Sequence, residues 1–90
     1  MNKVIVSVLG RDKVGIIAGT TRTLSEANAN ILDISQTILQ DYLTMIMVVD
    51  ISKCTVSFAE LKENLEKTGE SIGVHINAQK AEVFDFMHRI

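Results

Sequence analysis

Residues 3–17 of the chain read KVIVSVLGRDKVGII, and this stretch decides the fold. Its first part is dense in β-branched residues that alternate between two faces, which predicts a central strand over residues 3–9. The turn at residues 10–15 breaks the alternation. From Ile16 the apolar positions recur at spacings near 3.6, which predicts a helix from about residue 14 to residue 28.

The rest of the chain also shows apolar residues at the two spacings, two residues for strands and about 3.6 residues for helices. Two apolar runs separated by a short polar break predict an antiparallel hairpin. Ser57 and Glu60 match a capping box, which predicts the start of a second helix. The further segments predicted are strands over residues 31–39, 43–49 and 74–78, and a short amphipathic helix over residues 81–88.

This order predicts an α+β fold of the ferredoxin-like β-α-β-β-α-β class. Its four-stranded antiparallel sheet is expected to carry both helices on one face. We expect one domain over residues 1–79, followed by a helical tail over residues 80–90 that packs on the same domain or on a dimer partner.

Composition excludes several classes of function. The 90 residues carry a formal charge of -2, which disfavours binding to nucleic acid. Cys54 is the one cysteine, so an internal disulfide is excluded. The apolar runs are too short for a signal peptide or a membrane span. We therefore expect a cytoplasmic protein that binds no membrane.

The face of the sheet away from the helices is a candidate interface. Each predicted strand has apolar residues on both faces, while two helices cover only one. We expect a homodimer, with the tail helping, to cover the second face; a monomer covered by its own tail is the alternative. We expect that face to expose several of the following residues: Ile5, Leu9, Ile31, Leu39, Leu43, Met45, Met47 and Val49.

Residues for catalysis are few. His75 and His88 lie thirteen residues apart without metal-ligand spacing, and Cys54 has no histidine near it in sequence. The residues around Met45 and Met47 are typical of a core or an interface. The sequence therefore predicts no cofactor and no metal.

The turn at residues 10–16 is the one place where charge and two glycines gather between a central strand and a helix. Backbone N–H groups at Val14 to Ile17 would form a site for a carboxylate or phosphate. In the alternative reading Asp12 caps the helix, and Arg11 and Lys13 are solvated. The residues alone leave both readings open.

Two segments carry a resemblance to a known family. GRDKVGII at residues 10–17 and NANILDISQ at residues 28–36, together with the predicted element order, resemble the ACT domain. The likeness covers about residues 2–78. It is most similar to the short stand-alone ACT proteins of bacteria related to the glycine cleavage system repressor.

The resemblance implies a regulatory module without catalysis that is usually dimeric and senses an amino acid or similar metabolite at a domain interface. It also implies a larger, regulated protein as a possible partner of this chain. Many ligand-binding members carry proline where this chain has Val14, which suggests a less rigid turn here. The positions that match the family's site are Arg11, Asp12, Val14, Gly15 and Ile16 of one chain, with Asn30, Ile31 and Leu32 at the start of the second strand of its partner.

Elementary chemistry agrees with that assignment. The carboxylate of an amino acid would take N–H groups near Gly15 and Ile16, and its ammonium would seek Asp12 or the oxygen of Asn30. Ile31 would limit the size of the side chain.

Two other functions remain as alternatives. The first is a protein-interaction adaptor that uses the open sheet face or a sheet edge and binds no small molecule. The second is an acylphosphatase-like hydrolase, in which Arg11 would act with Asn77 or Asn30; the turn lacks the phosphate cradle expected for it. RNA binding is disfavoured because the sheet surface lacks paired aromatic residues.

Overall fold

The computed structural model describes residues 2–11 and 13–82 and confirms the predicted β-α-β-β-α-β order. The predicted tail helix falls mostly on residues 83–90, outside the described part of the chain. The elements are β1 (Lys3–Gly10), α1 (Lys13–Glu26), β2 (Asn30–Leu39), β3 (Tyr42–Asp50), α2 (Phe58–Ile72) and β4 (His75–Lys80).

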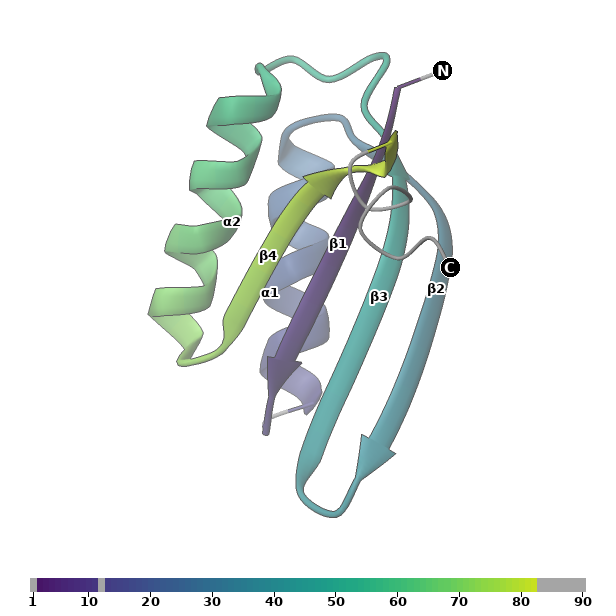
Figure 1. The fold of residues 1–90 in the computed structure, drawn as a ribbon. Coiled ribbons are helices and arrows are strands. Elements are labelled where there is room, and N and C mark those ends of the chain that lie inside the picture. Colours follow the sequence, from purple (N-terminus) through teal and green to yellow (C-terminus); the bar gives the residue numbers. More distant parts are fainter. Residues whose placement is uncertain (1, 12, 83–90) are drawn as a thin grey trace.

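The strands form one antiparallel sheet in the order β2-β3-β1-β4. Both helices lie behind this sheet in Figure 1, and its other face is turned toward the viewer. The β2–β3 hairpin extends beyond the other strands at the lower end of the view. The predicted two-layer α+β sandwich is therefore confirmed.

The core lies between the sheet and the helices, and β1 is at its centre. Val4, Val6 and Val8 are buried and face the helices, as the alternation predicts. Ile16 and Leu24 of α1 are completely buried above them. The other buried members of this cluster are Ala27, Leu43, Met45, Met47, Val49, Leu61, Leu65, Ile76 and Ala78.

One expectation about the open face is wrong. Leu43, Met45, Met47 and Val49 were candidates for exposure there, yet each is completely buried on the helix-covered face. The cause is the pairing register, in which these residues lie opposite Gly10, Val8, Val6 and Val4 of β1 and share their face. Of the other candidates, Leu9 points to the open face and is exposed, whereas Ile5 is buried. Ile46, which was not a candidate, also points to the open face and is exposed.

A β-bulge near the start of β2 corrects a second expectation. The sequence alternation places Ile31 on the same face as Asp33. In the structure the register shifts between these two residues, so that Leu32 is the extra residue. Ile31 therefore shares the helix-side face with Ile34, and Asp33 lies on the open side opposite Val48.

The ends of α1 and α2 depend on residues in left-handed conformation. Asn28 adopts φ 59°, as expected of the predicted helix exit, although α1 ends at Glu26 rather than at residue 28. The capping prediction for α2 is confirmed in part, since the Ser57 side chain accepts a hydrogen bond from the Glu60 N–H. Gly73 ends α2 with φ 75°.

Gly69 lies at a close approach of backbone to backbone. It is buried in the last turns of α2, which continue to Ile72. A Cβ there would lie 2.7 Å from the carbonyl oxygen of Val74, and the Val74 N–H donates to the Gly69 carbonyl at 2.8 Å. Gly69 thus lets the helix turn closely into β4.

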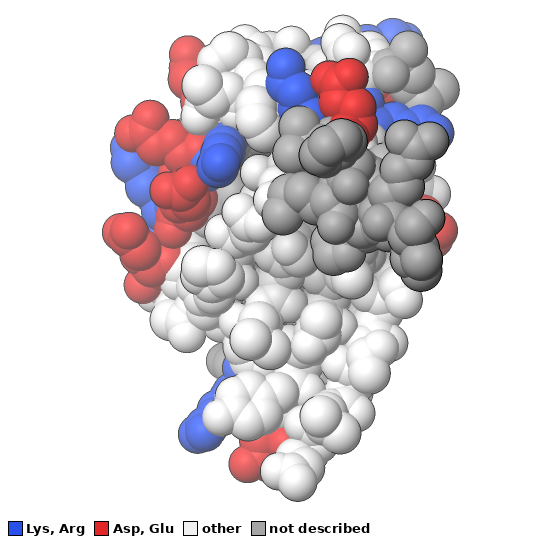
Figure 2. Space-filling view, in the orientation of Figure 1, with Lys and Arg blue, Asp and Glu red and all other residues white. Residues whose placement is uncertain are grey.

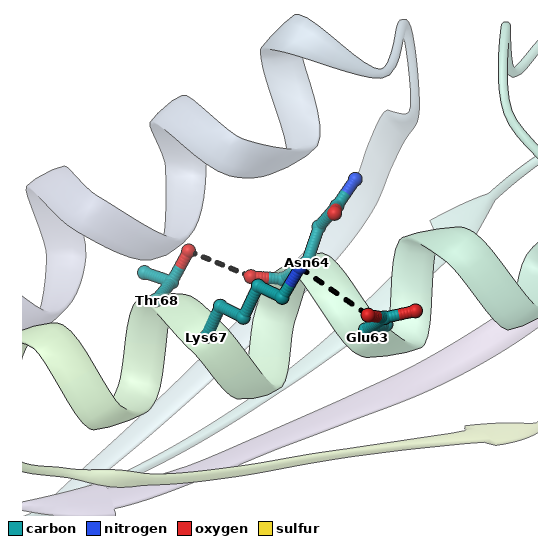
Figure 3. A network of polar contacts seen from close by, with 4 residues as sticks. All are labelled: Glu63, Asn64, Lys67 and Thr68. Atoms are coloured by element: carbon teal, nitrogen blue, oxygen red, sulfur yellow. Dashed lines mark hydrogen bonds and ion pairs between the residues drawn. The ribbon is translucent and has the colours of Figure 1, made fainter.

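The two helices contact each other through threonines and keep their charges outside. The hydroxyls of Thr23 and Thr68 hydrogen-bond across the helix pair. Figure 3 shows the neighbouring surface of α2, where Thr68 donates to the Asn64 carbonyl and Lys67 pairs with Glu63 at 3.2 Å. This predicted Glu63–Lys67 pair is exposed, so it contributes only a few tenths of a kcal/mol.

We expect Gly69→Ala to lower the free energy of unfolding by about 2 kcal/mol, because the new methyl group overlaps the Val74 carbonyl. Gly19→Ala is the matched control. A Cβ there meets the flexible end of Ile72 at 3.3 Å, and the gain in helix propensity offsets this crowding. Urea denaturation measures both values; equal stability of the two variants would contradict the close approach at Gly69.

A substitution at Thr20 is expected to raise the stability of the fold rather than to lower it. Its side chain is completely buried in α1, and its hydroxyl has no hydrogen-bond partner within residues 2–11 and 13–82. We expect Thr20→Val to stabilise the fold by about 1 kcal/mol, because it removes an unsatisfied buried polar group at nearly constant volume. Thr23→Val on the same helix loses the bond to Thr68 and is expected to destabilise. A loss of stability in Thr20→Val, measured by thermal unfolding, would show that the hydroxyl is satisfied.

Candidate functional site

The turn between β1 and α1 supplies the first half of the predicted site. Arg11 and Val14 are exposed, Val14 to 80%, and Gly15 is half-buried. Ile16 is completely buried in the core, so it offers no exposed surface to a ligand. Asp12 lies outside the described residues, which leaves its predicted role untested.

The N-terminus of α1 gives this turn a positive field. The first turn of α1 carries no acidic side chain. Among the described residues, no carboxylate within that turn offsets the partial positive charge of the helix end, and Arg11 adds a full positive charge nearby. The arrangement favours a negatively charged group at the turn.

The start of β2 supplies the second half. Asn30 and Leu32 are exposed, and Leu32 is the extra residue of the bulge. Ile31 is half-buried and packs on the core. The bulge therefore makes Leu32, rather than Ile31, the available apolar side chain.

The two halves lie at opposite ends of the sheet within one chain. Gly10, next to Arg11, pairs with Leu43, whereas Asn30 pairs with Asp50, and Asp50 in turn pairs with Lys3. The two ends are seven residue steps apart along β1, from Lys3 to Gly10, which amounts to roughly 24 Å. One copy of the chain therefore does not bring the predicted site residues together.

Tyr42 is a residue at the Arg11 end that the sequence analysis missed. The Arg11 Nη2 donates to the Tyr42 hydroxyl at 2.8 Å, and the guanidinium carbon lies 4.9 Å from the centre of the ring. The sequence places Tyr42 in a polar break; it lies beside Arg11 because Gly10 and Leu43 pair. Only the strand register, which local patterns do not provide, could have indicated this contact.

Two hollows adjoin the Arg11–Tyr42 contact. One opens toward the end of α2 and the start of β4, where Ile72, Val74 and His75 contribute to its lining. The other lies at the β2–β3 turn and is lined by Arg11, Ile38, Gln40, Asp41 and Tyr42. Arg11 and Tyr42 therefore form a wall between them.

A polar network surrounds the Asn30 end. Asp50 accepts hydrogen bonds from the Ser52 hydroxyl at 2.6 Å and the Ser52 N–H at 2.9 Å. The side-chain bond from Ser52, followed by the backbone bond, holds the pKa of Asp50 below its ordinary value. Asn30, Asp50 and Lys53 line a shallow hollow with Asn28.

The structure does not assemble the residues of the hydrolase alternative. Asn77 pairs with Ser7 near the middle of the sheet, and Asn30 lies at the far end, so neither is beside Arg11. Burial raises the pKa of the Cys54 thiol, which disfavours the nucleophilic thiolate. No group of three or more potential metal-ligating residues occurs within residues 2–11 and 13–82.

Comparison with protein families identifies the chain. The family model of the ACT domain matches residues 2–79. The chain belongs to the ACT domain family. ACT domains are regulatory modules that bind small ligands, and the resemblance noted in the sequence is thereby confirmed.

This ACT domain resembles whole proteins as well as parts of longer ones. A UPF0237 protein of Methanocaldococcus jannaschii is 54% identical over 90 residues, which is 100% of both chains. The ACT domain protein of Streptococcus pneumoniae is 42% identical with a TM-score of 0.80, covering 93% of this chain and 94% of that one.

A more distant likeness supports the fold alone. A structure described as a glycine cleavage system transcriptional repressor has a TM-score of 0.76 at 18% identity, covering 88% of this ACT domain and 45% of that chain. Among the residues described, no helix has the length and apolar character needed to cross a membrane.

Proposed function

We propose that this ACT domain is a non-catalytic regulatory module that binds a free amino acid or a related metabolite at the interface of a homodimer. In this proposal the β1–α1 turn of one copy and the start of β2 of the other line the site. The observation that carries the proposal is that the two halves of the predicted site lie at opposite ends of the sheet within one chain, so that a second copy is needed to join them. Occupancy would be transmitted to a regulated protein partner.

The outer edge of β2 supports pairing with a second copy. β2 has ten residues, of which all but Ile31 are exposed and only Asp33 is charged. Long apolar edge strands without lysine or proline are templates for further strand pairing. β4, the other edge strand, has six residues, ends in Lys80 and adjoins α2.

The exposed apolar residues are concentrated on the same strand. Of eight large hydrophobic side chains exposed in the described chain, four belong to β2. They are Leu32, Ile34, Ile38 and Leu39. Burying them against a second copy would remove this apolar surface from water.

Symmetry explains how such pairing would complete the site. A twofold axis pairs two copies of β2 in antiparallel sense, so the start of one strand lies beside the end of the other. Asn30 and Leu32 of the partner copy would then lie next to Leu39, at the end of the sheet where Arg11 is located. The separation along the strands is thereby removed, and the ligand would span the three strand spacings, roughly 14 Å, that remain between β1 and the partner's β2.

The chemistry of this site fits a small carboxylate-bearing ligand. The field of α1 and the charge of Arg11 favour a carboxylate, and Gly15 leaves room for the ligand's own backbone. Asn30 of the partner copy offers an amide oxygen to an ammonium group. The exposed bulge residue Leu32 would set the size of the ligand side chain.

A thermal-shift screen of the purified protein against the standard amino acids tests the ligand. We expect a saturable rise in melting temperature with at least one of them, because a ligand that binds only the folded state stabilises it. Gly15→Val is expected to abolish this rise, since its side chain occupies the space of the ligand. Ala18→Val, at an exposed position of the same helix, is expected to retain it. If no amino acid stabilises the wild-type protein, the sensor proposal is wrong and the adaptor alternative is favoured.

Sedimentation equilibrium tests the dimer. Ile38→Lys places a charge on the β2 edge and is expected to weaken the dimer at least tenfold, because the lysine would be desolvated on pairing. Ile46→Lys makes the same change on the open face of the sheet and is expected to leave the dimer intact. The reverse result would indicate two sheets packed face to face.

A further inference from the structure

Arg11 is held in place although it is exposed. Its guanidinium donates one hydrogen bond to the Tyr42 hydroxyl at 2.8 Å. The guanidinium carbon lies over the ring of Tyr42, 4.9 Å from the ring centre. A guanidinium has five N–H donors in a planar fork. The contact with Tyr42 uses one of them and orients the others.

An acidic residue shares the hollow that Arg11 lines. The hollow at the β2–β3 turn has a volume of about 450 Å³, within the range of small-molecule sites, and Asp41 and Ile38 contribute to its lining. Arg11 and Asp41 do not form an ion pair with each other. Figure 2 shows a basic and an acidic group near each other at this lower end, with uncharged atoms between them.

The turn itself fixes the position of Asp41. Gln40 adopts φ 56°, a left-handed conformation that ends β2 and reverses the chain within two residues. Leu39 and Tyr42 pair on either side of this reversal. Asp41 is therefore presented by a short hairpin whose far side carries the tyrosine that holds Arg11.

We propose that Arg11, Asp41 and Tyr42 form a clamp for the zwitterionic head group of an aliphatic α-amino acid. The clamp rests on the proposed amino-acid-binding function and names the residues that take the charges of the ligand. Arg11 binds the carboxylate through its fork, and Asp41 accepts hydrogen bonds from the ammonium. Tyr42 is a positioning residue that acts through Arg11, and Ile38, which is 53% exposed, contacts the aliphatic side chain.

The clamp residues that bind the charged groups of the ligand come from one chain, whereas a second chain would be needed to cover the bound ligand. All three clamp residues belong to one chain, so binding of the head group requires no second protomer. The hollow adjoins Ile38 on the β2 edge, where the proposed pairing would place the start of the partner's β2. A second copy would therefore cover the ligand, and its Asn30 and Leu32 would add to the contacts that Asp41 and Ile38 already make.

L-Valine is the probe for the clamp, with isovalerate and isobutylamine as analogues that lack its ammonium and its carboxylate. Tyr42 is the one tyrosine and the chain has no tryptophan, so intrinsic fluorescence reports directly on the clamp. We expect valine to change this fluorescence saturably, and each analogue to bind at least tenfold more weakly by calorimetry, because each loses one charge-assisted contact.

Charge-matched variants assign the two ionic contacts. Arg11→Gln and Asp41→Asn are each expected to weaken valine binding about tenfold or more. Arg22→Gln on α1 and Glu66→Gln on α2 change the same charges at exposed positions and are expected to bind valine as the wild type does. Circular dichroism confirms that each variant is folded.

Tyr42→Phe separates positioning from a structural role. This variant keeps the ring and loses the hydroxyl, so Arg11 is less well oriented. We expect it to weaken the carboxylate-bearing probes valine and isovalerate about threefold to tenfold and to leave isobutylamine unchanged. A structural role would affect all three probes alike.

The results separate failure of the clamp from failure of the proposed function. If valine does not bind, or binds equally well to Asp41→Asn and the wild type, the clamp is overturned. The sensor function still stands in that case if another amino acid stabilises the protein in a manner sensitive to Gly15→Val. If no amino acid binds at all, both proposals are wrong.

Discussion

The pairing of β1 with strands on both of its sides is the constraint on which the rest of the structure depends. β3 and β4 flank β1, so Val4, Val6 and Val8 are enclosed laterally by neighbouring strands and above by the helices. The register with β3 then decides which face each residue of β3 occupies. It also brings Tyr42 beside Arg11, so the candidate site depends on the same pairing as the core.

Local patterns were sufficient for the fold but not for the sidedness of its strands. The change between periods of 2 and 3.6, together with the apolar run that predicts β3, indicates every element described here, and the Ser57 cap and the Asn28 exit are encoded by residue type. The faces of β3 could not be assigned in this way, because its residues are apolar on both sides. The bulge at Leu32 was equally unpredictable, since one inserted residue inverts the alternation without leaving a mark in composition.

The candidate site was predictable where it depends on local sequence and not where it depends on register. The β1–α1 turn stands out because charge and glycine gather before a helix. The burial of Ile16, by contrast, shows that a position matching a family motif can serve the core alone with its side chain. Tyr42 contacts Arg11, and Asp41 lines the same hollow, through the strand pairing of distant segments, for which a single sequence contains no signal.

The described chain enters and leaves the domain at the same end. Val4 near the start of β1 pairs with Lys80 at the end of β4. The start of the first strand and the end of the last strand therefore lie side by side, far from the Arg11 turn, as Figure 1 shows for the N-terminal end. A domain whose ends lie together can be joined to other domains in tandem, or inserted into a loop, without being pulled apart. In this arrangement a covalently joined domain would be attached at the end of the sheet opposite the β1–α1 turn that carries Arg11. The same geometry allows one architecture to serve both as a separate small protein and as one part of a longer chain.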